Sequence, residues 1–179
     1  LIGANPRYEA TILNARIRKA YLNNNTKIIS LNEIGDLTYP YQSLNGKTKT
    51  IKEIFENTNE ISNEILKSQK PMIILGESFL NSGSAIYLFN LIKNYLIKND
   101  KFSNEWNPIN ILSNDASTVG CLDLDVINIK KDLIKDLNEN KFELVYLLGQ
   151  DDLNFKKKNE FVIYQGSHGD KGAEIADII

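Results

Sequence analysis

Short apolar runs alternate along the chain with longer segments in which apolar residues recur every three or four positions. Runs of four or five apolar residues between turn residues are typical of strands that are buried on both faces of a sheet. The first two residues, Leu1 and Ile2, have the character of a strand end. The other predicted strands are residues 27–31, 72–75, 109–112, 144–148 and 161–164.

Four segments between these strands place their apolar residues on one side of a helix. Pro6 suits the first turn of the first segment, because proline lacks the amide hydrogen that a helix interior needs. The third segment is the richest in apolar residues, so we expect it to be well buried. The predicted helices are residues 6–21, 51–65, 84–98 and 129–137.

Strands that alternate with helices predict right-handed βαβ crossovers. We therefore expect an α/β fold with a mostly parallel sheet and helices on both of its faces. A length of 179 residues suits a single domain over residues 1–179, and no stretch is typical of a flexible linker. The chain lacks an initiator methionine and both ends fall within a pattern, so we interpret it as a piece of a longer protein.

Composition excludes several classes of function. Hydrophobic residues make up 42% of the chain, charged residues 25%, and the formal net charge is −2. This balance argues against a dedicated nucleic-acid binder, which carries a basic excess. One cysteine and one histidine cannot build a zinc site or an iron–sulfur cluster within this chain. The apolar runs are also far shorter than a membrane span.

Three of the apolar runs close on a glycine, at residues 1–3, 74–76 and 147–149. A glycine allows the chain to turn sharply where a strand ends. In open α/β sheets, ligands bind at the carboxyl ends of the strands. These turns therefore mark the expected ligand-binding edge.

The first of these turns contains Gly3, Asn5, Pro6 and Arg7. It lacks the three glycines of a dinucleotide fingerprint, no P-loop motif occurs, and Pro6 removes an amide that a phosphate could use. Backbone amides and Arg7 could still hold an anion. The alternative is an ordinary strand-to-helix turn with Asn5 as the N-cap.

A second candidate loop covers residues 165–172 and contains three glycines, so its backbone could approach a ligand closely. His168 and Asp170 lie two residues apart within it and could form an acid/base pair. Neighbours at this spacing in a glycine loop need not touch, and no nucleophile accompanies them. We therefore interpret His168 as structural or solvent-facing.

The remaining chemical residues favour structural roles. Cys121 has apolar neighbours, so we interpret it as a small buried hydrophobe. Asp123 and Asp125 are expected to flank a helix end. The basic residues 156–158 are interpreted as a solvated loop. The residues by themselves thus predict no catalytic set.

Several motifs together resemble the large iron–sulfur subunit of respiratory complex I, the proton-translocating NADH:quinone oxidoreductase. The stretches NPRYEA and YQGSHGD are specific to that subunit, and the likeness runs from the first residue to the last. The motifs occupy residues 3–10, 14–19, 35–41, 116–117, 122–124, 163–170 and 172–177.

The resemblance implies [2Fe–2S] and [4Fe–4S] clusters in an amino-terminal part of the subunit that this sequence does not contain. It also implies a molybdopterin oxidoreductase-like, Rossmann-like fold for the rest. In molybdopterin enzymes such as formate dehydrogenase, the Gly-x-Asn-Pro turn and the late Ala-Asp stretch border a pterin nucleotide. In the complex I subunit the fold is kept without that cofactor. Candidates for the relic of this pocket are Gly3, Asn5, Arg7, Gln165, His168 and Asp177.

Three functions follow as hypotheses. The resemblance favours a non-catalytic structural segment that supports electron transfer from NADH to quinone, with no catalytic residue and no cofactor or metal of its own. Its expected partners are other peripheral-arm subunits, without nucleic acid and without direct membrane insertion. Its expected place is the cytoplasmic side of the bacterial inner membrane or the mitochondrial matrix side. The alternatives are a fragment of a molybdopterin-dependent oxidoreductase and a module that senses a nucleotide through Arg7 and His168.

Overall fold

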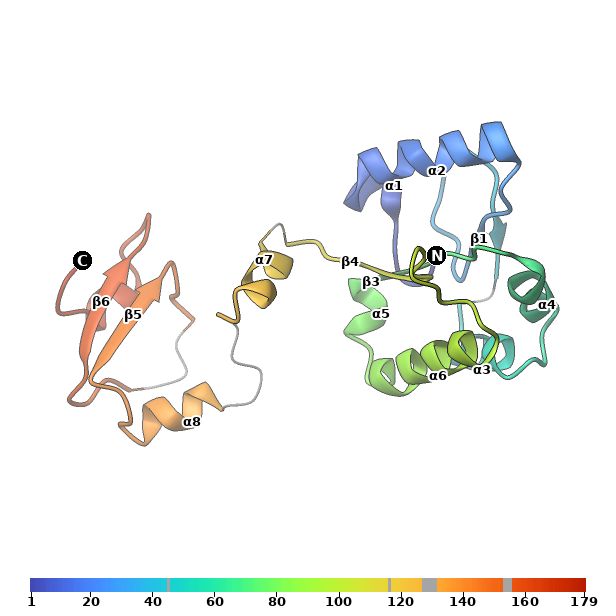
Figure 1. The fold of residues 1–179 in the computed structure, drawn as a ribbon. Helices are drawn as coiled ribbons and strands as arrows, with labels where there is room; N and C mark the ends of the chain where they lie inside the picture. Colours follow the sequence, from blue (N-terminus) through green and yellow to red (C-terminus); the bar gives the residue numbers. More distant parts are fainter. Residues whose placement is uncertain (45, 116, 127–131, 153–155) are drawn as a thin grey trace. The chain divides into compact units, whose positions relative to one another are not determined.

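The computed structural model describes residues 1–44, 46–115, 117–126, 132–152 and 156–179 (Figure 1). Its internal contacts separate two compact units, unit 1 (Leu1–Val119) and unit 2 (Gly120–Ile179). The expectation of a single domain over residues 1–179 stays a prediction.

Helices and strands alternate along both units, as an α/β fold requires. The elements of unit 1 are α1 (Pro6–Glu9), α2 (Thr11–Asn24), β1 (Ile29–Ser30), β2 (Gln42–Ser43), α3 (Thr48–Phe55), α4 (Glu60–Lys67), β3 (Ile73–Gly76), α5 (Glu77–Leu80), α6 (Ala85–Lys98) and β4 (Ile109–Leu112). Helix α7 (Thr118–Asp123) crosses the boundary between the units. Unit 2 continues with α8 (Leu133–Asn138), β5 (Leu144–Leu148), β6 (Phe161–Gln165) and α9 (Lys171–Ile175).

Every strand pair of the described residues is parallel, as predicted: β1 with β2, β3 with β4, and β5 with β6. In unit 1 the first two residues join two of these pairs. The Leu1 carbonyl accepts a hydrogen bond from the Leu31 amide at 2.9 Å, and the Ile2 amide donates to the Ile74 carbonyl at 2.9 Å. The side-by-side order is therefore β2, β1, residues 1–2, β3 and β4.

Helices cover both sides of the strands of unit 1, as expected. Figure 1 shows α1 and α2 on one side and α3 and α6 on the other. Strand β3 is buried throughout, and Leu75 at its centre is fully buried. The core between the strands and the second helix layer contains Ile2, Leu31, Ile51, Ile54, Phe55, Ile61, Ile73, Leu75, Phe79, Leu88, Ile92, Tyr95 and Leu96.

The prediction of strands buried on both faces is wrong outside β3. Ile111 of β4 is 57% exposed. Strands β5 and β6 alternate instead, with Leu147, Val162 and Tyr164 buried against α8 and α9 and the neighbouring positions open. A continuous apolar run does not reveal that only one of its faces is covered by the residues described here.

Two of the predicted helices are interrupted. The first breaks at Ala10, where the backbone becomes extended (φ −154°) between α1 and α2. The second breaks between α3 and α4, because Asn57 adopts a left-handed conformation (φ 62°) and the Asn59 side chain caps α4 by accepting from the Ile61 amide at 3.0 Å. The apolar periodicity continues across both breaks, so it could not predict where the helices are interrupted.

The other helix predictions are confirmed in part. Helix α6 buries Leu88, Ile92 and Leu96, but Ile86 is 81% exposed, so its apolar content exceeds the face that packs. Of the fourth predicted helix, α8 begins at Leu133, and Ile129 lies outside the described residues. Strand β2 and helices α5, α7 and α9 were not predicted, since β2 is a polar pair and these helices have only four to six residues.

Candidate functional site

The opening turn brings two strand ends into close backbone contact. Gly3 has a left-handed backbone (φ 62°), and a Cβ atom on it would lie 2.6 Å from the Phe79 amide nitrogen. A Cβ atom on Gly76 would lie only 1.9 Å from the Gly3 carbonyl oxygen. The Ser78 hydroxyl donates to that same oxygen at 2.8 Å. Both glycines are thus required by the packing of the chain against itself.

Asn5 and Arg7 both hold the segment that follows β1. The Asn5 side-chain amide donates to the Ile34 carbonyl at 3.1 Å. Arg7 Nη1 donates to the Asp36 carbonyl at 2.6 Å and pairs with its carboxylate at 2.5 Å. Asn5 stands at the N-cap position of α1, as the alternative interpretation expected, but its side chain makes no capping hydrogen bond and binds Ile34 instead.

The charge of Arg7 is balanced within unit 1. The Asp36 carboxylate accepts from the Thr38 amide at 2.7 Å and also faces Arg7, and both contacts hold the pKa of Asp36 below its usual value. An anion that approached Arg7 would have to displace this carboxylate. Arg7 therefore stabilises the loop that contains Asp36.

A buried pair that the sequence analysis missed holds the same loop. The Asn14 side-chain amide donates to the Leu37 carbonyl at 3.0 Å, and the Tyr39 hydroxyl donates to Asn14 Oδ1 at 2.7 Å. Burial raises the pKa of Tyr39 to about 12, so its hydroxyl stays protonated and able to donate. The available signal was the place of Asn14 on the inward side of α2, beside Leu13 and Ile17.

In unit 2 the glycine-rich loop folds around one phenol group. The Tyr164 hydroxyl lies 2.9 Å from an Asp151 carboxylate oxygen and 2.8 Å from the His168 carbonyl oxygen. Cβ atoms on Gly166 and Gly172 would lie 2.2 Å and 2.6 Å from atoms of the Tyr164 side chain. These two glycines make room for the Tyr164 side chain. From the sequence, they had been expected to let the backbone approach a ligand.

Tyr164→Phe is expected to destabilise unit 2 by roughly 1–3 kcal/mol, since it takes a donor from a half-buried carboxylate and from a backbone carbonyl. The measurement is the denaturant midpoint of the full-length chain. Tyr146→Phe is the matched control: its hydroxyl donates to Gln165 from a half-exposed ring, and we expect a change below about 0.5 kcal/mol. Equal effects of the two variants would contradict the role given to Tyr164.

The other candidates of this loop have separate partners. Gln165 accepts from the Tyr146 hydroxyl, and the exposed His168 ring lies 2.8 Å from the Ser167 hydroxyl. Asp170 accepts from the Lys171 amide at the start of α9. The structure thus gives His168 and Asp170 different partners, and the solvent-facing interpretation of His168 is confirmed.

Asp177 fastens the end of the chain to β6. Its carboxylate accepts from the amide of the buried Val162 at 2.8 Å and pairs with Lys157 at 2.6 Å. Lys157 and then the Val162 amide lower the pKa of Asp177. Lys157 is half-buried in this pair, so the solvated-loop interpretation is correct only for Lys156 and Lys158.

The folded-state pKa of Asp177 lies below its ordinary value of 3.8. Its carboxylate therefore contributes stability that is complete above this ordinary value and is lost as the pH falls through the folded-state pKa. We expect Asp177→Asn to be less stable than the unsubstituted chain at pH 7, with a difference that shrinks as the pH falls below about 4. Denaturant midpoints from pH 7 to pH 3 test this, and a difference independent of pH would contradict it.

Three further residues were assigned roles from sequence. Cys121, predicted to be buried, is half-exposed in α7. Asp123 is the last residue of α7 and Asp125 follows it with a left-handed backbone (φ 54°), so the prediction that both flank a helix end is confirmed. Among the described residues, no three His, Cys, Asp or Glu side chains converge as a metal site.

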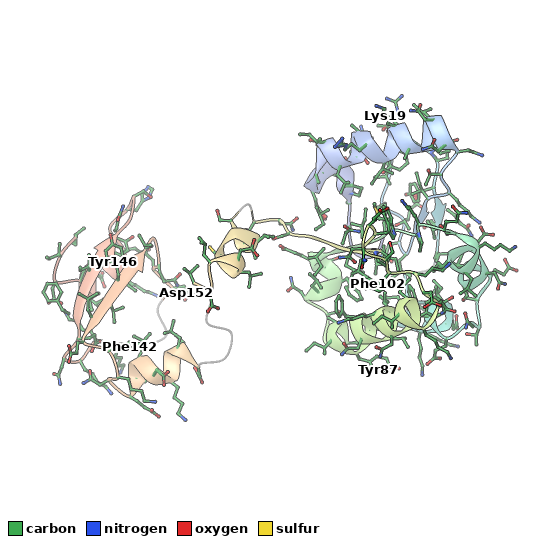
Figure 2. The ribbon with its side chains drawn as sticks, in the orientation of Figure 1. Lys19, Tyr87, Phe102, Phe142, Tyr146 and Asp152 are labelled. Carbon is green, nitrogen blue, oxygen red and sulfur yellow. The ribbon has the colours of Figure 1, made fainter. Side chains whose placement is uncertain are left out.

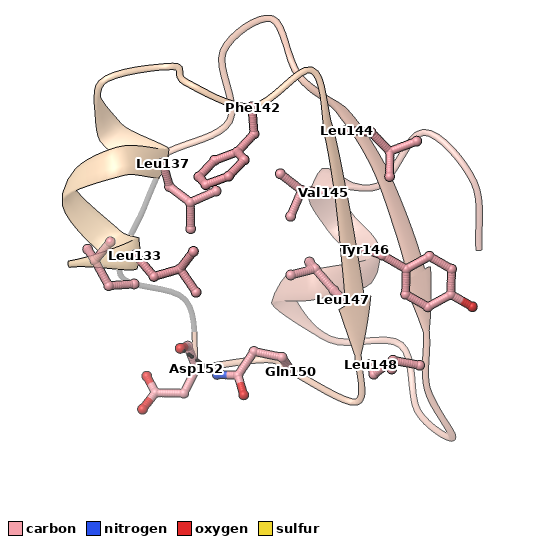
Figure 3. Close-up of a pocket in the computed structure, with 11 residues that line it drawn as sticks. Leu133, Leu137, Phe142, Leu144, Val145, Tyr146, Leu147, Leu148, Gln150 and Asp152 are labelled. Carbon is pink, nitrogen blue, oxygen red and sulfur yellow. Dashed lines mark hydrogen bonds between the residues drawn. The ribbon is translucent and has the colours of Figure 1, made fainter. Parts of the chain in front are cut away.

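A pocket in unit 2 lies between α8 and β5 (Figure 3). Its volume is about 480 Å³, and Figure 3 shows Leu137 and Phe142 facing Val145 and Leu147 across it. Gln150 and Asp152 are its polar lining residues. None of the six candidates from the sequence lines this pocket, and its apolar walls and carboxylate do not suit a phosphate.

The candidates were also compared with the needs of a pterin nucleotide, whose phosphates require cations and amide donors. In unit 1, Arg7 is neutralised by Asp36, and the Glu77 carboxylate stands just after β3, where it accepts from Asn114. In unit 2, the Asp177 carboxylate and the Lys157 ammonium are paired with each other, so this lysine is not left as a cation for a phosphate. Asn5 Oδ1 is buried without a partner among the described residues, but it is an acceptor. In the arrangement that each unit shows, the candidate residues do not fit a pterin nucleotide.

Family comparison agrees with the fold. The sequence profile of the molybdopterin oxidoreductase family matches residues 1–179, so the chain belongs to this family. Its α/β character with parallel strands agrees with that membership.

Within this family, the individual relatives that match the chain are subunits of NADH-ubiquinone or NADH-quinone oxidoreductases. The chain is 38% identical to the NADH-ubiquinone oxidoreductase 75 kDa subunit of Reclinomonas americana, over 100% of this chain and 26% of the relative. It is 36% identical to the mitochondrial NADH-ubiquinone oxidoreductase 78 kDa subunit of Candida albicans, over 100% of this chain and 24% of the relative. It is 35% identical to a subunit of the NADH-quinone oxidoreductase of Rickettsia bellii, over 100% of this chain and 26% of the relative.

These relatives confirm the resemblance on which the sequence analysis relied. The chain spans about a quarter of the length of the curated relatives it matches. In the described residues, no helix has the length and apolar character to cross a membrane.

Proposed function

We propose that residues 1–179 are a non-catalytic structural segment of the iron–sulfur electron-transfer subunit of an NADH:quinone oxidoreductase. The similarity to subunits of such oxidoreductases covers the whole chain and supports the proposal. The segment's contribution is to keep its shape, so that the parts of the subunit that carry electrons keep their geometry. The activity belongs to the complex.

One observation carries this proposal more than any other. At the opening turn, the two side chains that could have bound an anion already bind the loop after β1. Asn5 donates to the Ile34 carbonyl, and Arg7 pairs with Asp36. In unit 2, Gly166 and Gly172 accommodate Tyr164. Both glycine turns thus serve the fold. This supports the proposal that the candidates Gly3, Asn5 and Arg7 of unit 1, and Gln165, His168 and Asp177 of unit 2, are relics that no longer hold a cofactor.

The rest of the proposal extends what the resemblance to the large iron–sulfur subunit of complex I implies. The [2Fe–2S] and [4Fe–4S] clusters lie in parts of the subunit outside residues 1–179. The partners are other peripheral-arm subunits of the complex. The place of the segment is the cytoplasmic side of the bacterial inner membrane or the matrix side of the mitochondrial one.

A second candidate function is a molybdopterin-dependent oxidoreductase that binds a pterin nucleotide. The family profile over residues 1–179 favours it, because that profile covers cofactor-binding enzymes. The unpartnered Asn5 Oδ1 would then accept from a donor on the pterin ring. The pairing of Arg7 with Asp36 argues against it.

The proposed function is tested by isolating the full-length chain with an affinity tag under gentle conditions. We expect it to be recovered with other subunits, with iron, and with NADH:quinone reductase activity. Recovery of the chain as a stand-alone protein that oxidises a different substrate would contradict the proposal.

An Asp36→Ala variant, which frees the Arg7 loop, should reduce recovery of the complex without changing the chemistry of the complex that remains.

A further inference from the structure

Helix α2 is apolar on a second side that unit 1 leaves uncovered. Its inward side presents Leu13, Ile17 and Tyr21, which are half-buried. Ile12 and Leu22, on the opposite side, are 79% and 65% exposed. We call the exposed residues Ile12, Ala15, Lys19 and Leu22 the outer face of α2.

The spacing of this outer face is that of a helix–helix seam. Its residues follow one another at intervals of three, four and three positions, which places them in one row along the helix. Figure 2 shows Lys19, at the middle of the row, pointing away from the strands of unit 1. With 14 residues, α2 is about 21 Å long, so a facing helix could contact the whole row.

Cationic residues stand on and beside the outer face. Arg16 and Arg18 lie on either side of the row, and both are exposed. Helix α2 contains three cationic residues and no acidic one, although the whole chain has a net charge of −2. None of the ion pairs within the described part of the chain involves Arg16, Arg18 or Lys19.

These charges decide among possible occupants. A second copy of the chain would place like charges against each other across a two-fold contact, which is unfavourable. A lipid surface is bound by helices whose main apolar face is free, whereas the apolar side of α2 with Leu13, Ile17 and Tyr21 is already half-buried within unit 1. Apolar side chains flanked by cations instead suit an acidic protein helix, whose carboxylates pair with the rim while its apolar residues meet Ile12 and Leu22.

We propose that the outer face of α2 docks an acidic helix of a neighbouring polypeptide. The inference rests on the proposed function, in which the chain is one subunit of a larger complex. A contact along four residues is smaller than a stable interface, which buries on the order of 1,600 Å² in total. The outer face of α2 is therefore one part of a wider subunit contact, and it provides orientation through charge.

The test uses the full-length chain in the assembly from which it is isolated. Ile12 is replaced by the photoreactive residue p-benzoylphenylalanine, and the cross-linked peptide is identified by mass spectrometry. We expect a cross-link to an acidic segment of a different polypeptide. A cross-link to the chain itself, to a second copy or to phospholipid would overturn the proposal, and so would the absence of any cross-link.

Charge reversal tests the electrostatic part. The triple variant Arg16→Glu, Arg18→Glu, Lys19→Glu is expected to lower the fraction of chain retained in the complex by at least about fivefold at low salt. The matched control is Lys67→Glu, Lys93→Glu, Lys98→Glu, which makes the same charge change at exposed lysines of α4 and α6. Equal losses in both triple variants would overturn the proposal.

Two further measurements distinguish a folding defect from a loss of docking, and a failure of the proposed function from a failure of this inference. If the triple variant melts at a lower temperature, Lys19→Glu alone is compared with Lys98→Glu, and the single change is expected to keep the selective loss. If the unsubstituted chain is isolated without NADH:quinone reductase subunits, the proposed function fails. The cross-link at position 12 still tests the outer face in whichever assembly is recovered.

Discussion

Leu75→Asp is expected to destabilise unit 1 by roughly 4 kcal/mol or more. Leu75 is fully buried at the centre of β3, between residues 1–2 and β4. The substitution removes an apolar side chain and places a carboxylate in the apolar core, so the chain must either unfold locally or bury a charge. Thermal and denaturant melting of the full-length chain measures the loss, together with its recovery in the soluble fraction.

Ile86→Asp serves as the control for this prediction. Ile86 also belongs to unit 1, in α6, but its side chain is 81% exposed. We expect its effect on stability to stay within about 0.5 kcal/mol. A Leu75→Asp chain that melted like the unsubstituted one would show that β3 is not at the centre of the core.

Gly76→Ala is expected to have the second largest effect, a loss of roughly 2–4 kcal/mol. The added methyl group would lie 1.9 Å from the Gly3 carbonyl oxygen and 2.7 Å from the Ala4 Cα atom. Both neighbours are backbone atoms, so relief requires the opening turn to move away from β3. Because Asn5 and Arg7 follow immediately, the loop that they hold should loosen as well.

Gly83→Ala provides the matched comparison, since a Cβ atom there meets nothing within 4 Å. Alanine restricts the unfolded chain, so this variant should be neutral or more stable by a few tenths of a kcal/mol. Hydrogen exchange of the amides in residues 34–39 adds a second measurement. Faster exchange in Gly76→Ala alone would confirm that the two glycines hold the turn, and unchanged exchange and melting would contradict it.

Much of the fold is predictable from the sequence because apolar periodicity directly reports burial. Strands β4 and β5 coincide with predicted runs, β6 ends one residue later than predicted, and β3 both begins and ends one residue later. Strand β2 escaped because it is the polar pair Gln42–Ser43, held by hydrogen bonds to the backbone of β1. The break before α4 escaped because it depends on the backbone conformation of Asn57, which periodicity does not report.

The candidate site was less predictable, because its residues are defined by distant partners. The sequence places Arg7 at a turn, but its partner Asp36 lies 29 residues further on. A glycine-rich loop can approach a ligand or a side chain, and here Gly166 and Gly172 approach Tyr164. Motif recognition located both turns correctly, whereas only the three-dimensional contacts reveal what each turn holds.

The central claim is that this family member keeps the fold of the cofactor-binding enzymes without using the pocket. The most direct measurement is elemental and mass analysis of the gently purified full-length chain, for molybdenum, tungsten, iron, sulfide and extractable pterin nucleotide. The account predicts iron and sulfide without molybdenum, tungsten or pterin. Stoichiometric metal together with pterin would contradict it and would make the turn at Gly3, Asn5 and Arg7 part of a working cofactor site.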